Sequence, residues 1–176
     1  MLQRYFRPTW LVESIYQITA EDLHRQGISG IVTDLDNTLL PWHELDATPE
    51  LLDWVKNLNQ CGIKVMILSN NHTERVQRVA EQMGVIFYAS ALKPLRRGIR
   101  SLLDQTALEA DQIVLVGDQL LTDIFSANRM GIKSALVQPM VKTDIAFSKV
   151  NRCIERALIK HFQKSQAGWE WKQKIE

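Results

Sequence analysis

The chain has little cysteine and no long apolar run. Its two cysteines, Cys61 and Cys153, are far apart and too few to form a disulfide framework or a short metal-binding motif. No apolar run reaches the roughly 18 to 20 residues that cross a bilayer, and the first ten residues lack the pattern of a secretion signal. These absences argue against a secreted or membrane-spanning protein and predict a cytoplasmic one.

The chain also lacks an excess of charge of one sign. Its 176 residues include 21 Lys and Arg against 20 Asp and Glu, a net charge of +1, so the total does not indicate nucleic-acid binding. Hydrophobic residues make up 45% and charged residues 23%, which is the balance of a globular chain of one domain. Basic residues gather late, because residues 142–176 hold eight Lys or Arg against four acids, a net charge of +4.

Apolar stretches alternate with helical patterns, which predicts an α/β fold with a parallel sheet. The stretches are apolar at consecutive positions, as in strands that are covered by helices on both faces. We therefore expect a three-layer, Rossmann-like fold with a five-stranded parallel sheet. The expected strands are 30–35, 63–68, 85–88, 112–116 and 134–137, and the expected helices are 49–60, 72–83, 94–106 and 121–129.

Two segments flank the expected core of residues 30–140. Residues 1–29 read as an N-terminal extension to the sheet, with a helix capped by Thr19. Residues 141–176 are expected to pack on the same domain as a basic amphipathic helix, 149–163, and a loose polar tail. A solvated face and a lipid-binding face both remain open for this helix.

Two carboxylates lie at the end of the first expected strand, at the edge where open α/β sheets bind ligands. Asp34 and Asp36 are two positions apart, so on a strand their side chains point to the same side and can share a metal ion and a substrate. A simple turn or helix cap formed by Asp36 is the structural alternative.

The next three strands also end in polar residues. These are Ser69 and Asn70, then Lys93, then Asp118 and Asp123. Taken alone, Ser69 fits a helix cap and Lys93 a surface charge, and Pro94 is expected to open the following helix. Taken together, four strand ends converge on one site, and the hydroxyl and backbone N–H groups there suit an anion.

This order of residues resembles the motif series of the haloacid dehalogenase (HAD) superfamily, whose members are mostly Mg²⁺-dependent phosphatases. Its first motif, D-x-D-x-T, is met by Asp34, Asp36 and Thr38, and its second by Ser69. Its third motif is a lysine, and its fourth is G-D followed by four residues and D; these are met by Lys93, Asp118 and Asp123.

A class IIIA branch is more similar still, namely the YqeG-like proteins together with the mitochondrial phosphatidylglycerophosphate phosphatases. The stretches that carry this resemblance are Arg7-Pro8, Ser14-Ile15-Tyr16, Thr33-Asp-Leu-Asp-Asn-Thr-Leu39, Leu68-Ser-Asn-Asn71, Gly117-Asp-Gln-Leu-Leu-Thr-Asp123 and Asn151-Arg152. The resemblance extends to about residue 158.

The resemblance implies a role for each motif residue. Mg²⁺ is the implied cofactor, held by the carboxylates of Asp34 and Asp118 and by the carbonyl of Asp36. Asp34 is the implied nucleophile, which forms an aspartyl phosphate, and Asp36 is the implied acid and base. The other positions hold the phosphoryl group (Ser69, Asn70, Lys93) or support the site (Thr38, Asp123).

The cap domain of many HAD relatives has no space in this chain. Only 25 positions separate Thr38 from Ile63, and 24 separate Ser69 from Lys93. An open site favours a large substrate or a partner surface as its lid, and a phosphate at a membrane surface meets that need. Trp42, in the loop after the first motif, either contacts substrate or packs over the next helix.

The leading hypothesis is a phosphatase of a phosphomonoester, with the lipid phosphatidylglycerophosphate as substrate and peripheral contact with an anionic membrane. The alternatives are a phosphatase of a soluble sugar or nucleotide monophosphate and a non-catalytic module that senses phosphate or Mg²⁺. A phospho-relay receiver also uses an aspartate at a strand end, but it does not need Asp36. No nucleic-acid partner is expected, and the sequence leaves the oligomeric state open.

Overall fold

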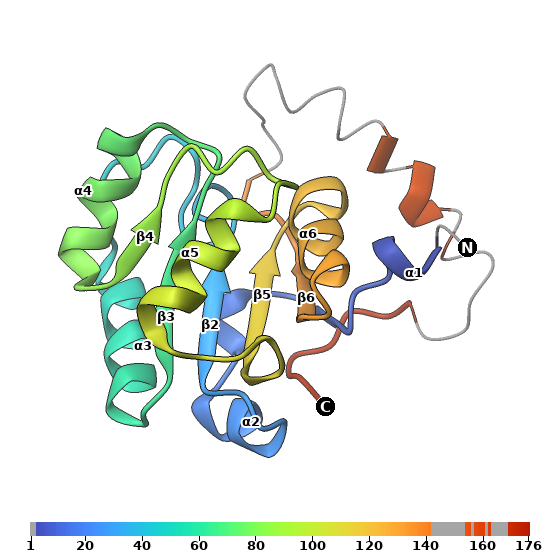
Figure 1. Cartoon of the computed structure of the whole chain (residues 1–176), viewed down its shortest axis with the longest axis horizontal. Coiled ribbons are helices and arrows are strands. Elements are labelled where there is room, and N and C mark those ends of the chain that lie inside the picture. Colours follow the sequence, from blue (N-terminus) through green and yellow to red (C-terminus); the bar gives the residue numbers. More distant parts are fainter. Residues whose placement is uncertain (1–2, 142–153, 156, 161, 163–168) are drawn as a thin grey trace.

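Six parallel strands form the central sheet of the computed structural model (Figure 1). The structure describes residues 3–141, 154–155, 157–160, 162 and 169–176. Along the sheet the strands follow the order β1-β6-β5-β2-β3-β4, and every pair of neighbours is parallel. Their bounds are β1 Trp10–Val12, β2 Gly30–Thr33, β3 Lys64–Leu68, β4 Ile86–Tyr88, β5 Ile113–Gly117 and β6 Lys133–Val137.

The sixth strand, β1, corrects the expected five-stranded sheet. It comes from the N-terminal segment, residues 1–29, in which no strand was expected, and it pairs with β6 so that Trp10 lies opposite Ala135. The strand is only three residues long, which is too short for a hydrophobic period to reveal it. The N-terminal segment is therefore part of the sheet.

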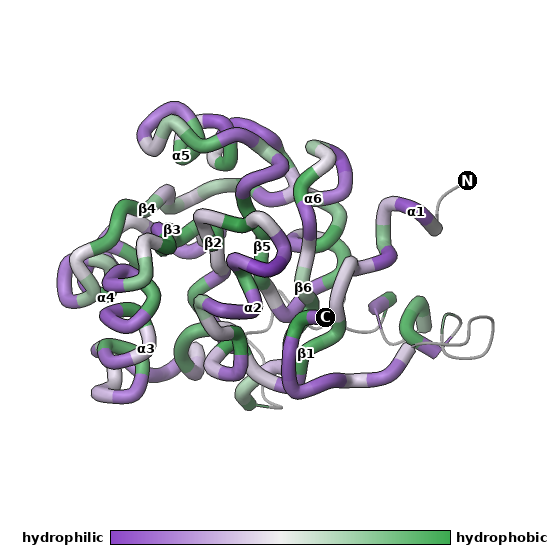
Figure 2. The backbone as a smooth tube through the Cα atoms, turned by 90° about the horizontal axis from the view of Figure 1, so that it is seen from below, coloured by the Kyte–Doolittle hydropathy of each residue, from purple (hydrophilic) through white to green (hydrophobic). Residues whose placement is uncertain are grey.

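Helices cover both faces of the sheet, as expected (Figure 1). One core lies between α2–α4 and strand residues such as Ile31, and the other lies between α5–α6 and the next strand residue, Val32. Hydrophobic and polar stretches follow one another along these helices, as in helices with one buried and one exposed face (Figure 2). The helices are α1 Gln3–Phe6, α2 Ala20–Arg25, α3 Pro49–Gln60, α4 Thr73–Met83, α5 Arg97–Thr106 and α6 Phe125–Arg129.

Local signals explain most helix bounds. The Thr48 hydroxyl accepts from the N–H of Leu51 at the start of α3, and Gly84 ends α4 in the left-handed conformation that glycine adopts readily. The helix expected from Pro94 begins instead at Arg97, because residues 93–94 form a turn.

The helix expected over 121–129 has two parts. A wider π-helical turn, Leu120–Ile124, precedes α6 and includes Asp123. Two single 3-10 turns, Ile15–Gln17 and Ala110–Gln112, complete the regular elements whose bounds the structure gives.

The last residues pack on the sheet, so the expectation of a loose tail is wrong for 169–176. Lys172 bridges to Val12 on β1, and the Trp10 indole donates to the main-chain oxygen of Glu176 at 2.7 Å. Trp169 and Ile175 are buried, because the segment carries apolar side chains that the edge of the sheet can cover. Figure 2 shows this end of the chain beside β1.

The expected helix 149–163 lies partly outside the described residues. Residues 154–155, 157–160 and 162 are helical, and Phe162 stacks on Trp169 with ring centroids 5.1 Å apart. Arg152, Arg156 and Lys164 lie outside the described residues. In the part of the chain that the structure describes, no helix is both long and apolar enough to span a membrane.

Candidate active site

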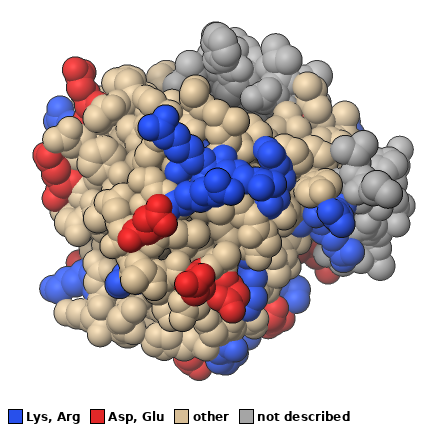
Figure 3. All heavy atoms as spheres, in the orientation of Figure 1, with Lys and Arg blue, Asp and Glu red and all other residues tan. Residues whose placement is uncertain are grey.

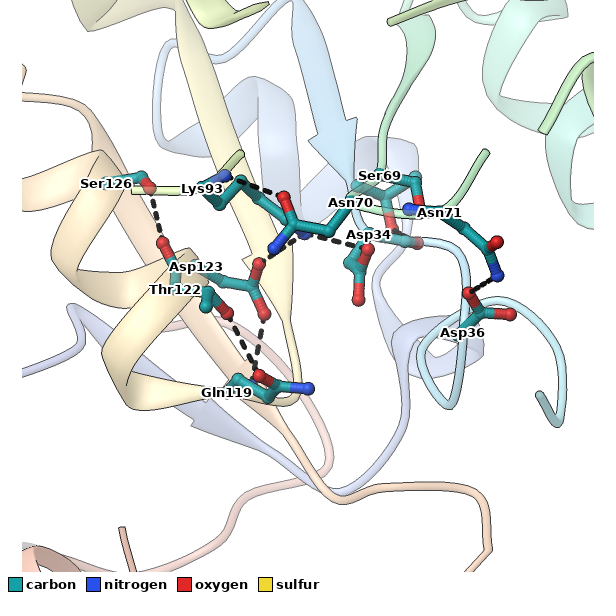
Figure 4. Close-up of polar contacts among 11 residues, drawn as sticks. Asp34, Asp36, Ser69, Asn70, Asn71, Lys93, Gln119, Thr122, Asp123 and Ser126 are labelled. Atoms are coloured by element: carbon teal, nitrogen blue, oxygen red, sulfur yellow. Dashed lines mark hydrogen bonds and ion pairs between the residues drawn. The ribbon is translucent and has the colours of Figure 1, made fainter. Parts of the chain in front are cut away.

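Three charged side chains from different elements meet at the carboxyl edge of the sheet (Figure 4). Asp34 follows β2, Lys93 lies in the loop after β4, and Asp123 lies on the π-helical turn after β5. The ammonium of Lys93 is 2.7 Å from Asp34 Oδ1 and 2.7 Å from Asp123 Oδ1. All three residues are buried, so this is an ionic cluster in the protein interior.

Backbone contacts fix the two carboxylates of this cluster. The N–H of Asp34 donates to the carbonyl of Val116 on β5 at 2.9 Å, which extends the sheet by one residue. Asp123 Oδ2 accepts from the N–H of Gln119 at 3.1 Å. Gly117 makes this position possible, because a Cβ there would overlap the Asp123 carboxylate.

Burial controls the protonation of the cluster. Desolvation raises the pKa of Asp34 to about 6, and the neighbouring Lys93 opposes this shift only in part. Burial alone would lower the pKa of Lys93, but the combined attraction of Asp123 and Asp34 outweighs burial and raises it. Lys93 is therefore a fixed positive charge at neutral pH.

A third carboxylate makes the cluster suitable for a metal ion. Oxygen atoms of Asp34, Asp118 and Asp123 lie within 4.8 Å of one another, and all three residues are buried. Carboxylate oxygens are the ligands that Mg²⁺ prefers. Among the described residues, the three buried acids share the single ammonium of Lys93, so a divalent cation would lower the cost of burying them. The donor set therefore fits Mg²⁺.

The Asp36 side chain lies apart from the three-acid cluster. Its carboxylate accepts from Asn71 Nδ2 at 2.8 Å and from Arg75 Nε at 2.9 Å. Arg75 Nη2 is also 2.7 Å from Asp36 Oδ1, and its side chain is only 8% exposed. The Asp36 carboxylate is thus held by Asn71, just before α4, and by Arg75 on α4.

Arg75 also holds the loop that follows the first motif. Its Nη1 donates to the carbonyl of Glu44 at 2.6 Å, and its Nη2 to that of Pro41 at 3.4 Å. Sequence reasoning missed Arg75, because one arginine among the charged residues of a helix reads as a surface charge. Within the loop, Trp42 is half-buried and meets the ring of His43 edge-on.

Backbone hydrogen bonds brace the turn around Asp36. Asn37 has φ 64°, a left-handed conformation that asparagine tolerates, and its N–H donates to the carbonyl of Leu40 at 2.6 Å. The hydroxyl of Tyr16, from the N-terminal segment, donates to the carbonyl of Leu39 at 2.6 Å. Thr38 is buried, and its hydroxyl has no hydrogen-bond partner among the described residues. Backbone hydrogen bonds and the Tyr16 hydroxyl therefore hold this turn, and the supporting role of Thr38 stays a prediction.

The residues after β3 connect the two halves of the site. Ser69 is buried and its hydroxyl accepts from the N–H of Asn71 at 3.1 Å, so it caps a turn ahead of α4. Asn70 Oδ1 accepts from the N–H of Lys93 at 2.6 Å and ties the lysine loop to β3. Every residue that the sequence assigns to the site therefore lies at one edge of the sheet.

Comparisons with known proteins find similar chains over most of the length of this one. The family model described as mitochondrial PGP phosphatase matches residues 2–142. The probable phosphatase YqeG of Bacillus subtilis is 37% identical over 171 residues, which cover 97% of this chain and 99% of that protein. The phosphatidylglycerophosphate phosphatase 1 of Arabidopsis thaliana is 24% identical over 170 residues, which cover 91% of this chain but only 49% of the plant protein.

Solved structures share the fold. The cobalt-bound deoxy-D-mannose-octulosonate 8-phosphate phosphatase of Haemophilus influenzae has a TM-score of 0.53 at 18% identity, over 64% of this chain and 69% of that one. An uncharacterised protein of Listeria monocytogenes has a TM-score of 0.51 at 19% identity, over 77% of this chain and 99% of that one. At such low sequence identity, these structural likenesses show a common fold alone.

Proposed function

Because this chain belongs to the family described as mitochondrial PGP phosphatase, we propose that it hydrolyses a phosphomonoester with Mg²⁺ through an aspartyl phosphate on Asp34. The membership confirms the resemblance that the motifs indicated. The chain is a phosphatase of the HAD type, so we do not carry forward the non-catalytic sensing module.

One observation carries the mechanism, namely the position of Lys93 between Asp34 and Asp123. A carboxylate nucleophile and a phosphomonoester are both anions, so a fixed cation must lower their repulsion before a bond can form. Lys93 supplies that charge where it touches the proposed nucleophile. Asp123 keeps Lys93 in place from the opposite side.

The first half of the reaction forms a bond from Asp34 to phosphorus. An oxygen of Asp34 attacks in line, the bond from phosphorus to the alcohol oxygen breaks, and the Asp36 carboxyl gives a proton to the leaving oxygen. In the second half, water attacks the aspartyl phosphate while Asp36 takes a proton from it. Inorganic phosphate leaves, and both aspartates return to their starting states.

Asp34 and Asp118 would hold Mg²⁺ with the Asp36 carbonyl, and Asp123 would orient them. When bound, Mg²⁺ supplies positive charge that the phosphoryl oxygens can face. The orientation of Asp36 toward Arg75 and Asn71 supports this division, because it leaves the Asp36 carboxyl to move protons. Ser69, Asn70 and Lys93 would then hold the phosphoryl group.

Phosphatidylglycerophosphate is the substrate we propose. The family membership supports it, and so does the short spacing between motifs, which leaves no room for a cap over the site. A lipid phosphate brings its own apolar bulk to an open site and can exclude water there. We further propose that the protein works in the cytoplasm against a membrane surface.

Turnover measurements test this proposal. The protein should release phosphate from phosphatidylglycerophosphate in mixed micelles faster than from glucose 6-phosphate or a nucleoside monophosphate, and a chelator should stop both reactions. Asp34→Asn should be inactive on every substrate. Faster turnover of the soluble phosphates would replace the lipid with a soluble metabolite, and full activity in chelator would refute the metal-dependent mechanism.

A further inference from the structure

A turn that exposes two leucines lies directly beside the site. The N–H of Leu95 donates to the carbonyl of Leu92 at 3.0 Å, which closes a four-residue turn around Lys93 and Pro94. Lys93 is buried against Asp34, whereas Leu92 is 67% and Leu95 53% exposed. The same turn therefore places a catalytic cation inside and two apolar side chains outside.

Leu92 stabilises the fold neither through its backbone conformation nor through burial of its side chain. Its φ is 50°, in the left-handed region that a leucine rarely adopts and that costs of order 1 kcal/mol or more. Of the large hydrophobic side chains that the structure describes, it is the most exposed. A residue that is unfavourable for the backbone and unburied indicates a role outside the folded core.

Arginines surround the turn. Arg96, Arg97 and Arg100 are exposed at the start of α5, whose first turn holds no acid. Positive side chains at a helix N-terminus are unfavourable because of the helix dipole, so these arginines do not stabilise the start of α5. Residues 82–103 contain no Asp or Glu, and Figure 3 shows Lys and Arg side chains gathered over α5 and α6.

Arg129 of α6 joins the arginines to the turn. Its Nη1 donates to the carbonyl of Pro94 at 3.3 Å, and its guanidinium lies 5.4 Å from the centre of the Phe125 ring. We call Leu92, Leu95, Arg96, Arg97, Arg100 and Arg129 the rim patch. Met140, which is 42% exposed, lies at the same edge of the sheet, because its N–H donates to the carbonyl of Asn37 at 3.0 Å.

We propose that the rim patch docks on an anionic lipid membrane, with Leu92 and Leu95 in the apolar layer and the arginines at the lipid phosphates. The inference rests on the proposed function and names the surface that receives its substrate. Charge complementarity favours a membrane, because the exposed leucines suit the acyl layer of an anionic bilayer and the nearby arginines suit its phosphates. A lipid phosphate at this surface meets Lys93 while its acyl chains stay in the bilayer.

This surface differs from the one that the charge distribution of the sequence suggested. That expectation placed membrane contact on the basic C-terminal helix, and its Arg152, Arg156 and Lys164 lie outside the described residues. The rim patch is instead continuous with the site, since Leu92 and Lys93 are adjacent. A protein docked through the rim patch would have the carboxyl edge of its sheet, where the site lies, facing the lipid.

Binding to vesicles without substrate tests the docking itself. The full chain should co-sediment with vesicles of phosphatidylcholine and phosphatidylglycerol, but not with phosphatidylcholine alone, and added salt should release it. In R97Q/R100Q, partition onto the anionic vesicles should fall about thirtyfold, at about 1 kcal/mol for each basic residue lost. K56Q, an exposed lysine on α3 at the other face of the sheet, should bind like the wild type.

The leucines are tested in the same assay with a matched control. Leu92→Asn introduces a residue that tolerates positive φ, so the turn should be preserved. This variant and Leu95→Asn should each lower vesicle partition about tenfold. Leu52→Asn changes a 37% exposed leucine on α3 and should have no effect on partition. All three variants should hydrolyse p-nitrophenyl phosphate at the wild-type rate, because none of these leucines belongs to the catalytic machinery.

The outcomes separate the docking proposal from the phosphatase proposal. If the leucine and arginine variants bound vesicles and hydrolysed the lipid like the wild type, the docking proposal would be refuted and the phosphatase proposal would stand. Vesicle binding that depends on the rim patch, with no turnover of any phosphomonoester, would support docking and refute the proposed function. If Leu92→Asn instead dissociated a dimer measured by light scattering, a second copy and not a membrane would occupy the patch.

Discussion

The guanidinium of Arg75 pairs with the carboxylate of Asp36 at 2.7 Å and joins α4 to the proposed general acid and base. The pair is mostly shielded from water, since the two side chains are 8% and 19% exposed. Among the described residues, Arg75→Ala would leave Asp36 with Asn71 as its remaining side-chain partner, and it would remove the hydrogen bonds that hold the Pro41–Glu44 loop. We expect kcat on p-nitrophenyl phosphate to fall at least tenfold, and stability to fall by about 1–3 kcal/mol.

Arg78→Gln is the matched control for that variant. Arg78 lies one turn later on α4 and pairs with Asp46 at 2.8 Å, but both side chains of this pair are more than half exposed. Water screens an exposed pair, so kcat and thermal stability should stay near the wild type. Equal losses in Arg75→Ala and Arg78→Gln would show that α4 tolerates no charge loss and that Arg75 has no special role.

Asp34→Asn should abolish turnover, because an amide cannot attack phosphorus. It should also raise the stability of the chelator-treated protein at pH 7 by about 1–3 kcal/mol, since the fold penalises the charged form of this buried carboxyl. Thermal unfolding with and without chelator measures the second effect. Substantial turnover by the variant would exclude Asp34 as the nucleophile.

The pH dependence of stability follows from the same carboxyl. Its pKa is about 6 in the folded protein and 3.8 by reference, so between these values the folded state binds more protons than the unfolded state. Chelator-treated protein should therefore gain stability as the pH falls from 7 toward 4, and this gain should be absent in Asp34→Asn. A wild-type curve that matches the variant would show that Asp34 is not penalised by burial.

Asp36→Asn should lose most turnover while keeping Mg²⁺ affinity, because its carboxyl faces Arg75 and its proposed metal contact is the backbone carbonyl. Asp118→Asn should instead weaken Mg²⁺ binding, because its oxygen lies in the three-acid cluster. Isothermal titration with Mg²⁺ on both variants separates the roles. Loss of affinity in Asp36→Asn with an intact fold would reverse them.

Gly117→Ala should damage both stability and activity, although it adds a single methyl group. The new Cβ would overlap the carboxylate of Asp123, so Asp123 and its partner Lys93 must shift. We expect a loss of about 1–3 kcal/mol and a clear drop in kcat. Gly62→Ala is the control: it has φ +80° in open space, should cost about 1 kcal/mol, and should leave kcat unchanged.

Most of the site could be predicted because parallel strands all end at the same edge. Asp34, Lys93 and Asp123 are 30 positions or more apart in the chain, yet each follows a strand, and the sheet order brings them within a single hydrogen-bonded cluster. Helices on both faces followed from the same pattern, since strand residues apolar at consecutive positions need cover on each side.

What could not be predicted depends on contacts between distant segments. β1 is a strand only because β6 offers it a partner, and the final residues are ordered because β1 gives Trp169 and Ile175 a surface to cover. Arg75 gains its role from packing against the Asp36 turn, which no feature of its own helix indicates.

The pairing of Lys172 with β1 also affects how copies of this protein meet one another. Lys172 donates to the carbonyl of Leu11 and accepts from the N–H of Glu13, both at 2.9 Å, on the outer side of the strand. Unpaired groups on an outer strand are a template on which another chain can add a strand and begin to aggregate. The final segment occupies that template, so it protects the sheet from intermolecular growth at the edge far from β4.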